Sequence, residues 1–173
     1  IKANADVAAN TKQLAKNVTV EANALIDASA TQSGNGGSIA IWSEVKTTVA
    51  GILKSMGGAL SGNGGFIETS SKGQVSVAPQ TQIVTTAVNG KAGTWLLDPQ
   101  SLIIDSATAS LIANVLGTSN VILDVQAAGC GGLGLCSNAG SSTMTFLQGA
   151  DIYSANPFTT LTMLAQDGTL NFK

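Results

Sequence analysis

Three aspartates recur along the chain at spacings that suggest chemistry. Asp98, Asp124 and Asp151 are separated by 26 and 27 residues. Carboxylates about 5 to 9 Å apart can hydrolyse glycosidic bonds, and a close group of carboxylates can bind Ca²⁺. However, Asp98 precedes Pro99 in a turn-like dipeptide, and Asp124 alternates with apolar residues. We therefore favour solvated turn or outward strand positions for them, and keep a carbohydrate-active enzyme with stacked aspartates as the alternative.

The side chains on which many active sites depend are missing from this sequence. The 173 residues include no His and no Arg, and all eight basic residues are Lys. Without His there is no imidazole general base or His-based zinc site. Without Arg or a cluster of Lys there is no basic stripe to follow a nucleic acid. We expect no catalytic residue, no metal, no cofactor and no nucleic-acid partner.

The composition is apolar and carries little charge. Hydrophobic residues make up 44% of the chain and charged residues only 10%, against about 25% charged in an ordinary soluble domain. Such a chain is expected to be ordered, with Ser, Thr, Asn, Gln and Gly on its surface. No apolar run approaches the length of about 18 residues that a membrane span needs, so no membrane span is expected.

Two cysteines lie close together in a glycine-rich segment. Cys130 and Cys136 enclose five residues, three of them glycine. We expect a local disulfide in an oxidising compartment, although its redox state stays open. A zinc site is disfavoured because the further ligands are absent.

A short glycine turn occurs twice, 28 residues apart. Its two copies are Gly34, Asn35, Gly36 and Gly37, and Gly62, Asn63, Gly64 and Gly65. A weaker third copy covers residues 89–94. Each copy is followed by a β-rich stretch, and a repeat of this length predicts a solenoid of stacked coils. The role of these turns would be structural, because Gly and Asn tolerate the backbone conformations of tight turns.

Short stretches with strand-like alternation fill the rest of the chain. They are typical of a parallel β-helix, in which each coil pairs with the coils above and below it at about 4.8 Å. We expect about six to eight coils of about 22 to 28 residues. The predicted strands cover residues 18–20, 25–26, 39–42, 45–49, 66–69, 75–77, 83–85, 94–97, 102–104, 121–125, 143–147 and 161–164.

Residues 107–116 depart from this pattern and predict one short helix. A hydroxyl residue, Ser106, precedes apolar positions at helical spacing, and Gly117 follows them. The helix is either a binding protrusion or, as we favour, an insertion that shields an open flank of the coils. Residues 1–17 are expected to be irregular or capping, with residues 3–16 open between a helix and a loose coil.

Exposed aromatic residues are the best sequence clue to a binding patch. The candidates are Trp42, Tyr153 and Phe158, because aromatic side chains dominate contact surfaces. Trp42 is equally compatible with the core and the surface. Trp95 lies in an apolar run and is expected to fill the coil.

Residues 61–71, with the run Gly93-Thr94-Trp95-Leu96-Leu97-Asp98-Pro99 after them, closely resemble one known family. This is the filamentous haemagglutinin type of secreted bacterial exoprotein, exported by two-partner secretion. The resemblance covers about residues 30 to 105, and it is fairly specific because the glycine turn and the second run occur in the same order.

The resemblance implies a right-handed parallel β-helix, secreted and displayed on a bacterial cell surface. It also implies an outer-membrane transporter as partner of the parent protein, and a glycan or protein receptor on a host or neighbouring cell. We therefore expect residues 1–173 to be a single β-helix domain, a fragment of a longer passenger. It would be non-catalytic and act as an adhesin or haemagglutinin-like rod or binding module in cell adhesion and virulence.

Overall fold

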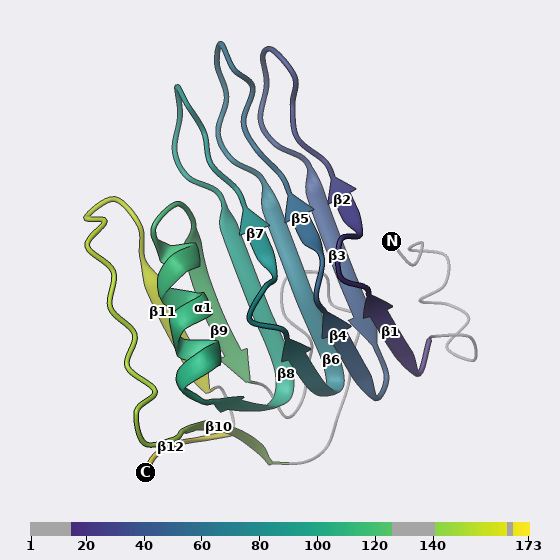
Figure 1. Ribbon diagram of the computed structural model, residues 1–173, viewed down its shortest axis with the longest axis vertical. Helices are drawn as coiled ribbons and strands as arrows, with labels where there is room; N and C mark the ends of the chain where they lie inside the picture. Colours follow the sequence, from purple (N-terminus) through teal and green to yellow (C-terminus); the bar gives the residue numbers. More distant parts are fainter. Residues whose placement is uncertain (1–14, 126–140, 166–167) are drawn as a thin grey trace.

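The chain forms a parallel β-solenoid of about five turns (Figure 1). The computed structural model describes residues 15–125, 141–165 and 168–173. The predicted fold class, a β-helix with one short helix, is confirmed for these residues. The cysteine pair Cys130 and Cys136, and residues 1–14, lie outside the described residues.

Three stacks of parallel strands make up the walls of the solenoid. The first stack contains β3 (Ser38–Ser43), the first parts of β6 (Phe66–Val77) and β8 (Thr94–Ile104), β9 (Asn120–Val125) and β11 (Leu161–Ala165). The second contains β1 (Asn17–Val20), β4 (Lys46–Val49), the second parts of β6 and β8, β10 (Ser142–Phe146) and β12 (Gly168–Phe172). The third contains β2 (Leu25–Asp27), β5 (Ile52–Lys54) and β7 (Gln82–Val84).

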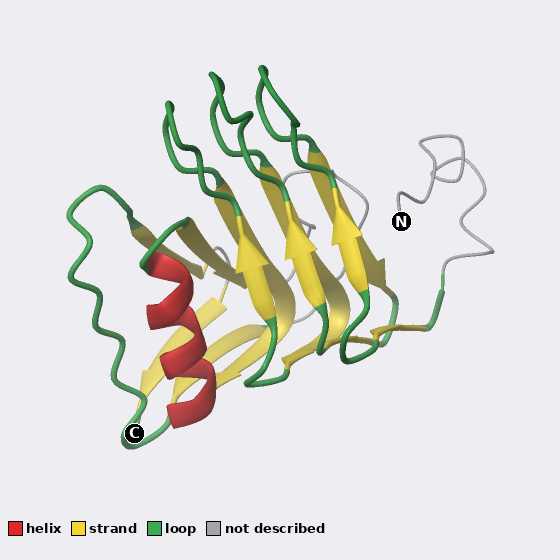
Figure 2. Cartoon of the chain, turned by 45° about the horizontal axis from the view of Figure 1, so that its top comes forward, coloured by secondary structure: helices red, strands yellow, loops and turns green. Residues whose placement is uncertain are grey.

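Two long strands join the first stack to the second. Because β6 and β8 run through both stacks, these stacks form one nine-stranded sheet, and the third stack is a separate sheet of three strands. Three loops connect the third stack back to the first, and they project side by side at the top of the molecule (Figure 2). The corner between the first and second stacks, by contrast, is formed by the continuous strands β6 and β8 and has no loop in these two turns.

The early turns have a constant length and the later turns are longer. Ser38 pairs with Phe66, and Phe66 with Thr94, so that equivalent positions lie 28 residues apart, as in the contact of Asn35 with Asn63. Farther along, Thr160 contacts Asn120 across 40 residues. The expectation of six to eight coils is wrong for this reason, because inserted segments take up chain that would otherwise form coils.

Alternate strand residues fill the interior. Trp95 is fully buried between Ile67 and Val121 of the neighbouring turns. Its indole N–H donates a hydrogen bond of 3.0 Å to the Thr69 hydroxyl, which satisfies the one polar atom of a large apolar side chain. Trp95 therefore lies in the core, as its apolar run indicates.

Helix α1 (Ser106–Leu116) lies beside β7, where the third stack would otherwise continue (Figures 1 and 2). It begins at Asp105, whose side chain accepts the Thr108 N–H at 2.8 Å, so the predicted hydroxyl cap at Ser106 is wrong. Carboxylates are as good as hydroxyls at this position, and Asp105 keeps the extended backbone that a cap needs.

The helix buries one face against β7, β8 and β9. That face consists of Ala109, Leu111, Ile112, Val115 and Leu116. This arrangement matches the interpretation of a shielding insertion rather than a protrusion. No helix in the described part of the chain is long and apolar enough to cross a membrane.

The last turn exposes side chains that are buried one turn earlier. Met163 and Leu170 stack on Leu123 and Met144, which are fully buried, but are themselves partly exposed. Phe172 stacks on Phe146 with ring centroids 5.0 Å apart. Among the described strands, β11 and β12 each pair on one side along their length. This apolar end surface is defined here by Met163, Leu170 and Phe172.

Candidate functional site

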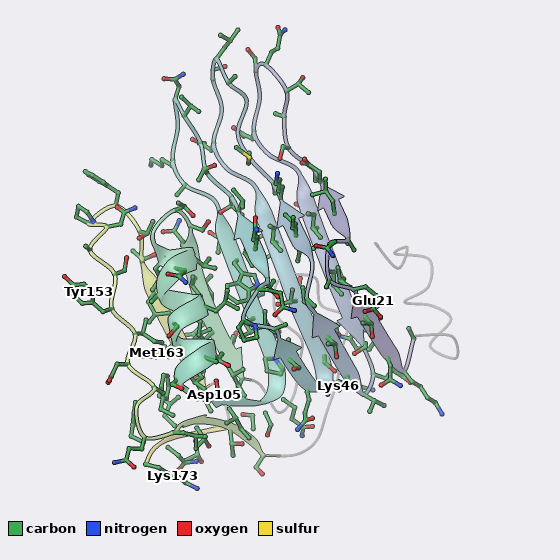
Figure 3. The ribbon with its side chains drawn as sticks, viewed as in Figure 1. Glu21, Lys46, Asp105, Tyr153, Met163 and Lys173 are labelled. Atoms are coloured by element: carbon green, nitrogen blue, oxygen red, sulfur yellow. The ribbon has the colours of Figure 1, made fainter. Side chains whose placement is uncertain are left out.

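The three candidate binding aromatics lie in two separate places. Trp42 lies on β3, at one end of the first stack, and its side chain is half-buried. Tyr153 and Phe158 lie beyond the other end of that stack, in the 147–160 loop, and are 80% and 87% exposed. Figure 3 shows Tyr153 at the outer side of this loop. The structure therefore brings Tyr153 and Phe158 onto one loop and leaves Trp42 several strands away.

The 147–160 loop is held against the end of α1 and the start of β9. The Asn156 amide donates to the Gly117 carbonyl at 2.8 Å, and the Thr159 hydroxyl donates to the Leu116 carbonyl. The Thr160 N–H donates to the Asn120 side chain at 3.0 Å. Its two aromatic rings are thus presented from an anchored segment, which lowers the entropy lost on binding a partner.

Two of the three recurring aspartates occupy neighbouring strands, and the third does not join them. The pairing of Leu97 with Leu123 places Asp98 and Asp124 at the next position of β8 and β9. Asp151 lies on the 147–160 loop and is exposed. The three carboxylates therefore do not converge in one acidic groove.

The turn-like interpretation of Asp98 and Pro99 is wrong. Both lie within β8, where Pro99 pairs with Ser71. The expectation of a solvated position is also wrong, because the side chains of Asp98 and Asp124 are only 3% and 4% exposed. Leu96, two residues before Asp98, is buried too, so burial in this part of β8 does not follow the alternation of the sequence.

A further buried carboxylate, Glu68, lies on β6 beside this pair. Its side chain is 2% exposed, and its Oε1 accepts the Ser70 hydroxyl at 2.7 Å. Its Oε2 has no hydrogen-bond partner in the described structure. Burial raises the pKa of Glu68 above its usual value, and the Ser70 hydroxyl lowers it in part. The sequence analysis missed Glu68, because a single Glu in a β-rich run carries no spacing signal.

The described acidic residues offer no grouped set of metal ligands. Among residues 15–125, 141–165 and 168–173, no group of three or more His, Cys, Asp or Glu side chains has the geometry to hold a metal ion. The arrangement around Glu68 instead favours a proton on a buried carboxyl group.

The two glycine turns stack directly on each other. Gly34 and Gly62 have φ angles of 116° and 122°, in the region that disfavours other residues. A Cβ on Gly62 would overlap the Gly34 carbonyl oxygen. The Asn35 side chain accepts the Asn63 backbone N–H at 2.8 Å, and the Asn63 side chain accepts the Lys91 N–H at 2.9 Å. The asparagines therefore bond to the backbone of the next turn rather than to each other.

A cleft opens in the second stack between β6 and β8. The ladder between these strands shifts register after Ser71 and ends where Gln74 pairs with Ser101. The adjoining segments of β6 and β8 border a hollow of about 490 Å³, within the range of ligand sites. Its lining is Lys46, Gln74, Val75, Ser76, Val77, Pro79, Leu97, Ser101, Leu102, Ile103, Asp105, Ala107, Thr108, Thr143 and Thr145.

The cleft combines an apolar floor with a polar rim. Val75 and Leu102 belong to the rows that pack on the core, whereas Gln74 and Ser76 are exposed at the rim. On the β8 wall, the Ser101 hydroxyl lies 3.0 Å from the hydroxyl of Thr143 on β10. The sequence analysis missed this feature, because it depends on where strand pairing stops.

The comparisons with known proteins add no family assignment to these observations. A search with protein-family models and a search of curated proteins each found no match to this chain.

Proposed function

We propose that this chain is a non-catalytic, rod-forming segment of a secreted bacterial surface exoprotein of the filamentous haemagglutinin type, and that it acts as an adhesive or binding module. The observation that carries the proposal is the stacking of its motifs. The glycine turn at residues 62–65 stacks on the turn at residues 34–37, and the run at residues 94–99 pairs with the start of β6. The residues that resemble the family thus occupy equivalent positions of successive turns.

The solenoid has the physical properties of a rigid display scaffold. Successive turns are joined by backbone hydrogen bonds and by bonds to side chains, such as the one that the Asn63 N–H donates to the Asn35 side chain. In a solenoid each turn contacts mainly its neighbours, so the shape extends by repetition. The low charge of the chain, with 10% charged residues, is compatible with a surface that contacts glycans or proteins through neutral hydrogen bonds.

The proposal includes partners and a location. The parent protein would be exported by an outer-membrane transporter and displayed at the bacterial surface. The segment would there meet a glycan or protein receptor on a host or neighbouring cell. Tyr153 and Phe158 are the favoured contact residues, because they are exposed aromatic rings on an anchored loop.

Adhesion of the purified chain to cells and to glycan arrays tests this function. The variant Tyr153→Ala/Phe158→Ala should reduce binding several-fold without a change in Tm, since both rings are exposed. Trp42→Ala tests the separate site on β3. Val88→Ala removes an exposed apolar side chain elsewhere and should leave binding unchanged. If the wild-type chain bound nothing, the adhesive role would be contradicted and a passive rod would remain.

The carbohydrate-active alternative rests on Asp98 and Asp124, which lie on neighbouring strands. Their burial counts against it, because a polysaccharide would have to reach carboxylates that are almost inaccessible. Assays for polysaccharide cleavage with the wild-type chain and with Asp98→Asn decide the matter. Cleavage that the substitution abolishes would establish the enzyme and overturn the non-catalytic proposal.

A further inference from the structure

The cleft between β6 and β8 is bordered by two strand segments that run in the same direction. Residues 75–77 of β6 pair with β4 on their other side, and residues 102–104 of β8 pair with β10 on theirs. The ladder that joins β6 to β8 stops before these segments, at Gln74 and Ser101. Each segment therefore has one side in a regular ladder and one side facing the cleft.

The backbone direction of each cleft residue follows from the neighbouring ladders. The Gln74 N–H donates to Val45 and the Ala78 N–H donates to Val49, on the β4 side. Because successive residues of a strand direct their backbone groups to opposite sides, Val75 and Val77 direct theirs toward β8.

The same reasoning applies to the other wall. The Leu147 N–H donates to the Ile104 carbonyl at 2.9 Å, so Ile104 faces β10. Ile103 is the next residue in the strand, and its N–H and C=O groups point toward β6. Both walls thus present backbone donors and acceptors to the cleft at every second residue, about 6.6 Å apart along each strand.

A bulge on β6 explains why the two strands separate. Two residues of β6, Lys72 and Gly73, lie between the last paired positions, where β8 has only Gln100. An extra residue bends a strand and interrupts its ladder. A Cβ on Gly73 would overlap the Val45 carbonyl oxygen, so the bulge is held tightly against the preceding turn.

Two charged side chains, Lys46 and Asp105, lie at opposite ends of the cleft. Lys46 is on β4, at the end where the cleft begins, and Asp105 follows the last residue of β8, at the start of α1 (Figure 3). Both strands run from the lysine end to the aspartate end. A bound strand that ran parallel to them would place its first residues near Lys46 and its last near Asp105.

We propose that this cleft binds an extended segment of another polypeptide, which adds as a strand between β6 and β8, parallel to both. Strand addition uses backbone hydrogen bonds for affinity and pockets for alternate side chains for specificity. Here the floor at Val75 and Leu102 accepts apolar side chains, while the rim at Ser76 and Thr143 meets polar ones. The preferred segment alternates apolar and polar residues, with an acidic residue first and a basic residue last.

This inference goes beyond the proposed function, because it holds wherever the protein resides. A glycan is disfavoured as the occupant, since its hydroxyl groups do not repeat at the spacing of the two walls and would leave the apolar floor without a partner.

A labelled hexapeptide with the sequence Glu-Thr-Val-Ser-Val-Lys, blocked at both ends, is the probe. Its binding to the full 173-residue chain is measured by fluorescence anisotropy. Methylation of two backbone nitrogens keeps every side chain and removes two donors, so it should weaken binding about tenfold or more. Equal binding of the methylated peptide, or no binding of the parent peptide, would overturn the proposal.

Variants of the protein test the same site independently. Ile103→Pro removes an N–H that faces the cleft and leaves the β10 ladder intact, whereas Ile103→Val keeps it. Only Ile103→Pro should weaken binding, by about tenfold. Circular dichroism and Tm show whether each variant keeps its fold.

A charge swap covers the case in which Ile103→Pro fails to fold. Lys46→Glu changes an exposed side chain and should abolish the preference for the probe over a peptide whose Glu and Lys are exchanged, because Asp105 still attracts a basic residue at the last position. An unchanged preference would contradict the parallel orientation and therefore the proposal. Competition by a neutral oligosaccharide, with no effect of backbone methylation, would identify a glycan site instead.

Discussion

At the scale of single residues, the tight contacts between turns decide what the chain tolerates. Gly34 and Gly62 occupy the same position of two successive turns and have nearly the same φ. Only Gly62 lies against the carbonyl of the turn before it, because a Cβ on Gly34 would meet nothing within 4 Å. Substitution of Gly34 therefore measures the cost of backbone strain alone, and substitution of Gly62 measures the cost of strain together with that of atomic overlap.

Gly62→Ala should destabilise the fold more than Gly34→Ala. Strain alone predicts a loss of about 1–3 kcal/mol in the free energy of unfolding for Gly34→Ala. Gly62→Ala adds overlap with the Gly34 carbonyl, which should cost about 1–3 kcal/mol more. Urea unfolding of the two variants measures the difference, and equal losses would show that the turns can move apart.

The buried carboxyl of Glu68 predicts a dependence of stability on pH. Burial raises its pKa in the folded state above the usual value of 4.5, so folding favours the protonated form. The stability that this group contributes is therefore present below pH 4.5 and is lost as the pH rises through the raised pKa.

Glu68→Gln should remove this loss. Stability of the wild type should fall relative to the variant as the pH rises from 4.5 through the raised pKa of Glu68, and the variant should be the more stable above that range. Urea midpoints across this range provide the measurement. If the urea midpoints of the two proteins changed with pH in the same way, a raised pKa at Glu68 would be contradicted.

At the scale of secondary-structure elements, α1 depends on its cap. The Thr108 N–H holds the pKa of Asp105 below its usual value of 3.8. The stabilisation is therefore present above pH 3.8 and is lost as the pH falls through the lowered pKa. The cap matters beyond the helix, because α1 covers the side of β7.

Asp105→Ala should destabilise the chain by about 1 kcal/mol, the usual cost of a lost N-cap. Asp105→Asn should keep most of that stability at neutral pH, since its amide oxygen can accept the Thr108 N–H, and should lack the loss at acidic pH. Thermal unfolding of the three proteins at two pH values tests both statements. A variant Asp105→Ala as stable as the wild type would show that packing alone fixes α1.

The strands were more predictable than their connections. Alternation located most strands, but β5 was missed because it has only three residues after Gly51, and β12 because it begins with Gly168. The continuity of β8 through Pro99 was also missed, since Asp-Pro favours a turn in the absence of tertiary contacts. Pairing with Ser71 overrides that local preference.

The candidate sites were less predictable than the fold. Exposure of Tyr153 and Phe158 agrees with their selection as surface aromatics. The cleft and the burial of Asp98 depend on which turn lies above which and on where a ladder ends. These properties come from register, which a single sequence specifies only weakly.

At the scale of the whole molecule, the apolar end surface predicts self-association. Met163, Leu170 and Phe172 are exposed, and within the described part of the chain the strands that carry them have ladder partners on one side. Exposed strand edges with apolar side chains favour pairing with other chains. The 173-residue chain should therefore form larger species as its concentration rises, as sedimentation velocity would show.

Leu170→Lys should reduce this association, because a charge at a strand edge opposes pairing. Val88→Lys, at an exposed position in the loop between β7 and β8, is the matched control and should not. If both variants associated as the wild type does, another surface would be responsible.

The orientation of the ladders also determines how the molecule would respond to force. The strands run across the solenoid, so the hydrogen bonds between successive turns point along its axis. Traction along that axis pulls these bonds apart one row at a time rather than shearing many together. We therefore expect the molecule to unfold turn by turn under load. The long strands β6 and β8, which pair with neighbours in both stacks, should be among the last to unfold.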